Sequence, residues 1–107
     1  MTMFDDRERA FEAKFARDGE MAFRVTARRN KLLGQWAAGR MELTPAETDA
    51  YATSVVQADF EEVGDEDVLR KLLSDLSAAG VDCDEAVIRQ AMADCDVEAR
   101  RQLLGSI

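Results

Sequence analysis

Apolar side chains recur along this chain at spacings of three and four residues, the period of an α-helix rather than of a β-strand. The strongest stripe lies between Asp65 and Gly80, and similar stripes run through residues 20–38, 45–62 and 85–104. No stretch alternates with period two, and β-branched residues are sparse. The pattern therefore predicts an all-α fold. The stripe expected to form the core helix consists of Val68, Leu69, Leu72, Leu73, Leu76 and Ala79.

Polar capping residues predict where several of these helices begin. Thr44 and Glu47 can form a capping box, with Pro45 at the first helical position, where its missing N–H costs nothing. Asp82 and Glu85 have the spacing of a second capping box. From this second box we expect one helix as far as Leu104, with a possible irregularity near residues 94–96. Asp65 is the expected cap of the core helix.

Glycines predict where helices end and where two helices approach closely. Gly39, Gly64 and Gly80 follow the apolar stripes and are expected to be C-terminal stops. Gly34 lies inside a stripe, which favours close helix packing over a bend. Because the predicted connections are short, consecutive helices should be antiparallel neighbours. We therefore expect an antiparallel four-helix bundle over residues 19–107.

The opening segment is heavily charged but carries three phenylalanines. Read as a helix, it places Phe4, Phe11 and Phe15 at spacings of seven and four, so the three rings share one narrow face. Asp5 is a good N-cap, and Glu8 completes a capping box. The segment is therefore expected to form a helix with an aromatic face.

We define residues 1–18 as the arm, because the weak helix former Gly19 follows them as a candidate hinge. Burying three Phe rings contributes about 5 to 9 kcal/mol. Ordering the arm costs about 1 kcal/mol or more per residue, so alone it should be a marginal helix. We expect a mobile arm that becomes helical on a partner. An acidic helical adaptor with this aromatic face packed on its own core is the alternative that the residues leave open.

The charge of the chain is divided unevenly. The net charge is -8, but residues 1–40 hold nine basic against six acidic residues, whereas residues 41–107 hold five against sixteen. An acidic body argues against binding nucleic acid or anionic membranes, while the basic first part could meet an acidic protein surface. No apolar run is long enough to span a bilayer, and the opening residues lack a signal-peptide pattern. A cytoplasmic location is expected.

Most enzyme chemistry has no candidate residues here. The chain has no His, which removes a His general base, and it lacks a Gly-rich phosphate loop. Its acidic clusters lack EF-hand spacing, so no metal or other cofactor is expected. Cys83 and Cys95, if they share a helix, are too far apart to bridge, and we interpret both as small buried apolar residues.

One basic cluster supports an alternative function. Arg28, Arg29 and Lys31 could bind a phosphate, and the acidic clusters at 61–67 and 82–98 could attract a cation, which together would make the chain a small nucleotide-binding or cation-binding helical regulator. A solvated or interfacial face is the simpler interpretation of the same three residues.

Three stretches of the chain together resemble a known family. They are MFDDRERAFEAKFA at 3–16, ARRNKLLGQWAA at 27–38 and ADFEEVGDEDVLRKLLSDL at 58–76. In order and spacing they resemble the ζ-type inhibitor subunit of the F-type ATP synthase of alphaproteobacteria. The resemblance implies a non-enzymatic four-helix protein whose N-terminal segment becomes helical in an α/β catalytic interface and blocks ATP hydrolysis.

The resemblance also implies partners and a binding segment. The implied partners are the α, β and γ subunits of the ATP synthase head, and the implied place is the cytoplasmic face of the inner membrane. The free protein would be monomeric. The partner-binding residues that the resemblance assigns to the arm are Met3, Phe4, Asp5, Asp6, Arg7, Glu8, Arg9, Phe11, Glu12, Lys14 and Phe15.

Overall fold

The computed structural model describes the backbone of residues 3–59 and 64–105 and the side chains of residues 19–59 and 64–105. Within these ranges every regular element is a helix, which confirms the predicted all-α fold. The helices are α1 (Met3–Arg40), α2 (Pro45–Ala58), α3 (Glu66–Ala78) and α4 (Glu85–Leu104).

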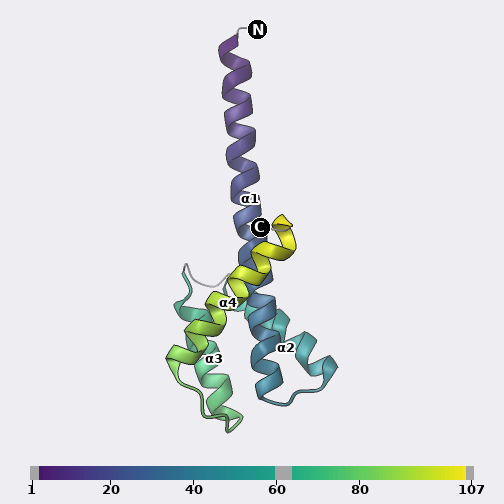
Figure 1. Cartoon of the computed structure of the whole chain (residues 1–107), viewed down its shortest axis with the longest axis vertical. Coiled ribbons are helices and arrows are strands. Elements are labelled where there is room, and N and C mark those ends of the chain that lie inside the picture. The colour runs from purple at the N-terminus through teal and green to yellow at the C-terminus, as the bar shows by residue number, and fades with distance from the viewer. Residues whose placement is uncertain (1–2, 60–63, 106–107) are drawn as a thin grey trace.

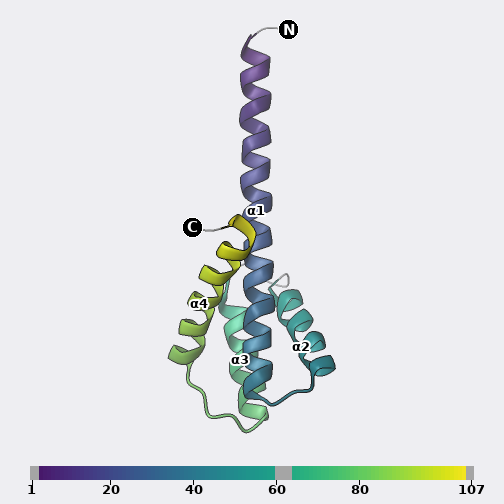
Figure 2. The same cartoon turned by 45° about the vertical axis from the view of Figure 1, so that its right-hand side comes forward.

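The helices form a bundle around the second half of α1. Figures 1 and 2 show α2 running back along α1, after which α3 and α4 reverse direction in turn. This confirms the predicted antiparallel bundle. The first half of α1 extends past the ends of the other three helices, which gives the molecule dimensions of 64 × 29 × 26 Å (Figure 1).

The candidate hinge at Gly19 does not interrupt the helix, because α1 is one helix from Met3 to Arg40. A single glycine costs only about 1 kcal/mol in a helix, which its neighbours can offset. Directly after Gly19, Arg24 Nη2 lies 2.8 Å from Glu20 Oε1 in a pair spaced by four residues. The arm and the first bundle helix are therefore parts of one element.

The predicted stop at Gly39 is also displaced. Gly39 is helical, and the left-handed residue is Glu42, with φ of 59°. The Glu42 N–H donates to the Gly39 carbonyl at 3.2 Å, and the Leu43 N–H donates to the Ala38 carbonyl at 3.0 Å. These two bonds form a Schellman motif, so α1 ends by satisfying its own carbonyls rather than at a glycine.

The predicted start of α2 is confirmed. The Thr44 side chain accepts from the Glu47 N–H at 3.2 Å, and Glu47 Oε1 accepts from the Thr44 N–H at 2.9 Å. The bond from Thr44 lowers the pKa of the Glu47 carboxyl. α2 ends at Ala58, earlier than the predicted end near residue 62.

The caps of α3 and α4 differ from the sequence prediction in one respect each. Asp65 stands at the N-cap of α3 but makes no side-chain cap bond. The N-cap of α4 is Asp84 rather than Asp82, and its carboxylate accepts from the Val87 N–H at 3.0 Å. Cys83, directly before this cap, packs against the core cluster that contains Ile88, in the positions of a hydrophobic staple.

The end of α3 and the continuity of α4 match the sequence. Gly80 has φ of 78°, and the Val81 N–H donates to the Leu76 carbonyl at 2.9 Å, which completes a second Schellman motif. α4 is a single helix as far as Leu104.

The core joins all four helices, and the stripe on α3 is its centre. Four of the six predicted stripe residues are buried, Leu73 packs against them, and Ala79 is exposed, contrary to prediction. The apolar members of the core cluster are Leu33, Ala37, Val55, Val68, Leu69, Leu72, Leu76, Ile88 and Ala91.

Gly34 allows α1 and α2 to approach each other closely, as predicted. A Cβ atom at this position would lie 2.7 Å from the Ala52 Cα and 3.2 Å from Val55 Cγ2. Carbon atoms not bonded to one another are stable at about 3.5 to 4 Å. Only glycine fits here without moving a helix.

Candidate functional site

The predicted partner-binding residues all lie on the first part of α1. The structure describes their backbone as helical, but α1 begins at Met3, so Asp5 lies inside the helix rather than at the predicted N-cap. Their side chains lie outside the described residues, so the prediction that Phe4, Phe11 and Phe15 bind a partner stays a prediction.

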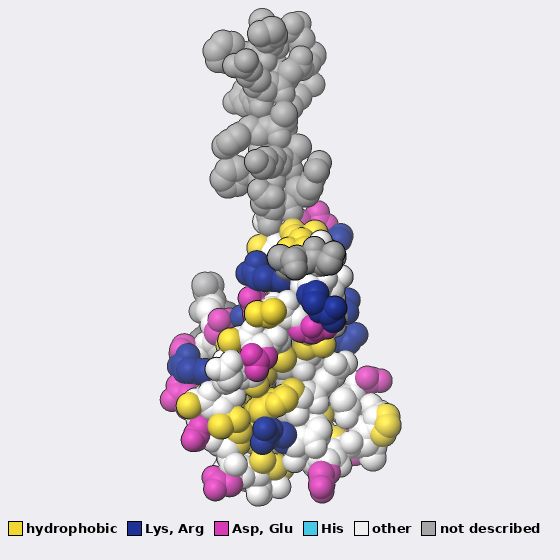
Figure 3. Space-filling view, in the orientation of Figure 1, with side chains coloured by type: hydrophobic (Ala, Val, Ile, Leu, Met, Phe, Trp, Pro, Cys, Tyr) yellow, Lys and Arg dark blue, Asp and Glu magenta, His cyan; other side chains and the backbone are white. Residues whose placement is uncertain are grey.

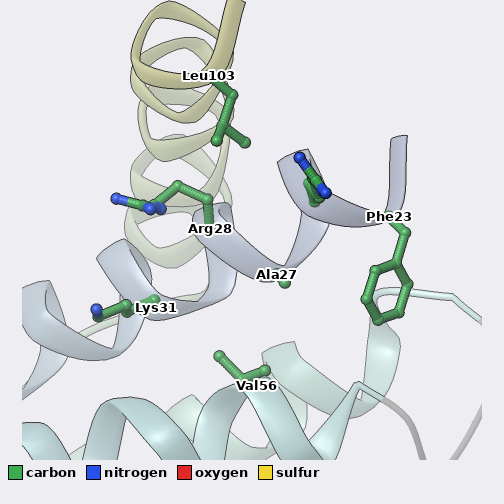
Figure 4. Close-up of a pocket in the computed structure, with 7 residues that line it drawn as sticks. Phe23, Ala27, Arg28, Lys31, Val56 and Leu103 are labelled. Atoms are coloured by element: carbon green, nitrogen blue, oxygen red, sulfur yellow. The ribbon is translucent and has the colours of Figure 1, made fainter. Parts of the chain in front are cut away.

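A cavity of about 470 Å³ opens beside α1 near the base of the arm. We call it the cationic groove, because four apolar and three basic side chains line it (Figure 4). α1 contributes most of them, and α2 and α4 contribute one each. The lining residues are Phe23, Arg24, Ala27, Arg28, Lys31, Val56 and Leu103.

Two of the three basic residues in the groove have no carboxylate partner within the described part of the chain. Arg28 Nη1 donates to the neutral Gln102 Oε1 at 3.1 Å, which ties α1 to the end of α4. Lys31 is exposed and makes no described ion pair. Figure 3 shows Lys and Arg side chains gathered on the end of the body from which the arm extends. The groove therefore has a positive potential in an acidic protein.

Arg29, the third residue of the predicted phosphate cluster, faces the interior. It is only 7% exposed, and its Nη2 lies 2.8 Å from Asp65 Oδ1 and 3.0 Å from Asn30 Oδ1. The Arg29 side chain turns inward to Asp65 and Asn30 and does not line the groove, whereas Arg28 does. The structure thus brings Arg28 and Lys31 together and separates Arg29 from them.

The interior pair explains why Asp65 does not cap α3. Its carboxylate, 52% exposed, binds Arg29 and so fixes the start of α3 against α1. Asn30 is buried beside Arg29, and the Asn30 Nδ2 has no hydrogen-bond partner within the described residues. A buried charge without its partner is costly, so this pair specifies how the two helices are aligned.

A second polar contact joins α2 to α3. The Tyr51 hydroxyl donates to Asp75 Oδ2 at 2.8 Å, and Lys71 Nζ donates to the same oxygen at 3.0 Å. Lys71 Nζ also lies 5.1 Å from the centre of the Tyr51 ring. Burial, followed by the bond to Asp75, raises the pKa of Tyr51 well above its usual range. The phenol is therefore a neutral donor throughout the physiological range.

A smaller cavity, about 300 Å³, lies between the end of α1 and α4. Trp36 and Arg40 line one wall, with the Arg40 guanidinium carbon 4.8 Å from the Trp36 ring centre. Cys95 lies in the same wall as Asp94, and partial burial raises the pKa of its thiol. Cys83 and Cys95 are both free thiols, and both are half-buried against the core rather than fully buried as predicted.

Metal and membrane sites find no support in the part of the chain that the structure describes. No group of three His, Cys, Asp or Glu side chains there could hold an ion. Several acidic residues instead pair along their own helices, as Glu85 does with Arg89 at 2.7 Å. Of the helices searched, none is both long and apolar enough to cross a bilayer.

The phosphate cluster predicted from the sequence contains two of the three cations of the groove, Arg28 and Lys31, but none of its apolar walls. Phe23, which is 55% exposed, is two residues from the buried Val25 and so lies on the opposite side of the helix, and this is the signal that could have marked it. Val56 lies within the apolar stripe of residues 45–62, yet it lines the groove. Leu103 comes from the far end of the chain, and its place could not be inferred from local spacing.

Comparisons with known proteins agree with this architecture. A protein whose solution NMR structure is known is 44% identical in sequence. The match covers 78% of this chain and 95% of that chain, with a TM-score of 0.71. No curated protein sequence matches significantly. A family model described as ATPase inhibitor subunit zeta matches residues 1–102. The chain therefore belongs to the ATPase inhibitor subunit zeta family.

Proposed function

We propose that this protein inhibits the F-type ATP synthase by inserting its arm into an α/β catalytic interface of the head, which blocks ATP hydrolysis. Membership of the inhibitor family supports the inhibitory role. The observation that carries the insertion mechanism is the course of α1, which begins in the arm, projects past the other helices and ends in the bundle core (Figure 2).

A single helix suits a wedge that must resist closure of the interface. Residues packed in the core hold the second half of α1 through Val25, Leu33 and Ala37. An axial load on the arm would pass along continuous backbone hydrogen bonds into the bundle. A break at Gly19 would instead let the arm bend away.

The arm carries groups that fit a protein interface. Phe4, Phe11 and Phe15 are the proposed buried anchors, since aromatic residues contribute most to interface energy. The basic residues Arg7, Arg9 and Lys14 are the proposed partners of acidic groups on the head. Asp5 and Glu8 lie in the first turns of α1, where acidic residues favour the helix dipole, and the remaining proposed contacts are Met3, Asp6 and Glu12.

The rest of the proposal follows from this mechanism. The α and β subunits would contact the arm, and the γ subunit would be reached at the inner end of the interface. The protein would act without catalysis, as a monomer, from the cytoplasmic face of the inner membrane. The bundle would be the anchor that stays outside the interface.

Inhibition assays with arm variants test the proposal. Phe11→Asp would place a carboxylate where an aromatic ring is buried, so the concentration for half-inhibition of ATP hydrolysis should rise at least about tenfold. Val97→Asp is the matched control, because Val97 is 66% exposed on α4. Removal of residues 1–18 should abolish inhibition. Equal inhibition by the chain lacking residues 1–18 would contradict the mechanism.

A nucleotide-binding regulator is the second candidate function. Arg28 and Lys31 support it, because both line one open cavity. The buried Arg29 does not line this cavity. A titration with ATP, followed by amide NMR, should then shift the signals of residues beside the groove. No localised shift at millimolar ATP would remove this candidate.

A further inference from the structure

We propose that the cationic groove is a second docking surface, which holds an acidic amphipathic helix of the ATP synthase head while the arm is inserted. This inference rests on the proposed function, because it assigns the bundle its own contact with the same partner. The groove is distinct from the arm residues to which inhibition is assigned.

Charge is the first argument for an acidic occupant. The whole chain carries 22 acidic and 14 basic residues, yet three basic side chains and no acidic one are among the described residues that line the groove. Arg24 pairs with Glu20 in an exposed contact of 2.8 Å, while Arg28 and Lys31 have no described carboxylate partner. Because surface ion pairs are weak, Arg24 can exchange this partner for another carboxylate at little cost.

Spacing is the argument for a helical occupant. Arg24, Arg28 and Lys31 are four and three residues apart on α1, so they form a row about 10 Å long on one face. Carboxylates at positions i, i+4 and i+7 of a second helix repeat at the same distances. A helix lying along α1 could therefore pair with all three cations.

The apolar walls require that this helix be amphipathic. Phe23, 55% exposed, lies at one end of the groove, and Val56 reaches from α2 toward α1 (Figure 4). Leu103 adds an apolar side chain from α4. Apolar side chains next to the carboxylates of the partner helix would cover these three residues. The acidic body, with sixteen acidic against five basic residues after residue 40, disfavours the same helix elsewhere.

Carbodiimide cross-linking of the full-length chain to purified ATP synthase head tests the inference, because this reagent joins an amine directly to a carboxylate. The chain has three lysines, of which Lys31 lines the groove and Lys71 pairs with Asp75 on α3. Mass spectrometry should find Lys31 joined to an Asp or Glu in a helical segment of the head. Lys71 is the internal control and should form no such link.

Binding measurements separate this proposal from the inhibitory mechanism. Lys31→Glu should weaken binding of the full chain to the head about tenfold at low salt and less at high salt, whereas Lys31→Arg should retain affinity but lose the cross-link. Arg100→Glu, a charge reversal on the exposed part of α4, is the matched control and should change affinity less than about twofold. An equal loss of affinity for the head in Lys31→Glu and Arg100→Glu would overturn the proposal.

The remaining outcomes identify another occupant or the failure of the first proposal. If millimolar ATP displaces the head from the wild-type chain but not from Lys31→Glu, the groove binds a nucleotide, and the proposal that it holds a helix of the head is overturned. Cross-links from Lys31 to a second copy of this chain would assign the groove to a contact between copies and would also overturn the proposal. If Phe11→Asp still inhibits while Lys31 forms its link, the arm mechanism fails and the groove contact stands.

Discussion

Gly34 is the position where a single methyl group should have the largest effect on the bundle. In Gly34→Ala, the new Cβ would lie 2.7 Å from the Ala52 Cα and 3.3 Å from its Cβ. The first of these is a backbone atom, so no rotamer change can relieve the contact. α1 and α2 must therefore move apart, and the fully buried Val55 loses packing contacts with the neighbouring core.

Two opposing terms set the change in the free energy of unfolding of Gly34→Ala. Alanine is favoured over glycine inside a helix by about 1 kcal/mol. Overpacking of a tight core costs typically about 1 to 3 kcal/mol, and the upper end applies where the obstruction is backbone. We therefore expect Gly34→Ala to lower the free energy of unfolding by about 2 kcal/mol.

Gly39→Ala is the matched control, because Gly39 is on the same helix and a Cβ there would meet no atom within 4 Å. It should gain up to about 1 kcal/mol from helix propensity alone. With a urea dependence of about 1.5 kcal/mol per molar, the unfolding midpoints of the two variants should differ by about 2 M. A midpoint for Gly34→Ala at or above that of Gly39→Ala would refute the close contact between α1 and α2.

Three further predictions concern the polar contacts and the base of the arm. Tyr51→Phe should lower the free energy of unfolding by about 1 kcal/mol at pH 7. Because the pKa of Tyr51 is raised above 10.0 in the folded state, this difference between wild type and variant should be lost as the pH rises above 10. An equal difference in the free energy of unfolding at pH 11 would contradict this prediction. The hydrogen bond from Arg101 lowers the pKa of Glu98 to about 2. The ionised Glu98 therefore stabilises the fold above pH 4.5, and this contribution should fade as the pH falls toward 2. A carboxyl NMR titration should find a higher Glu98 pKa in Arg101→Gln. Gly19→Ala should lower the concentration for half-inhibition about fivefold, since it favours the helix by about 1 kcal/mol, and weaker inhibition would count against a helical arm.

Local signals in the sequence predicted local structure well. Thr44 and Glu47 form their box whatever lies elsewhere in the bundle, and Gly80 adopts the positive φ that other residues avoid. The period of the α3 stripe likewise identified its buried face. These features depend on residues within one or two turns, which is why spacing alone suffices.

Features decided by tertiary packing could not be predicted in the same way. Arg29 was grouped with its exposed neighbours, but the interior site beside Asp65 lies 36 residues further along the chain. Asp82 and Asp84 are both good caps by residue type, and the structure uses Asp84. The groove needs Leu103 and Phe23 together, and only the assembled bundle brings them to one cavity. The continuity of α1 through Gly19 shows how weakly one glycine opposes a helix supported on both sides.

Amide hydrogen exchange across residues 3–16 tests the central claim most directly, because it follows the arm in the full-length chain with and without the ATP synthase head. A helix that projects from the bundle should open easily when free and become protected inside a catalytic interface. The account predicts that exchange of these amides slows at least about 100-fold when the head is added. Unchanged exchange in the arm, with new protection only in residues 19–59 and 64–105, would contradict it.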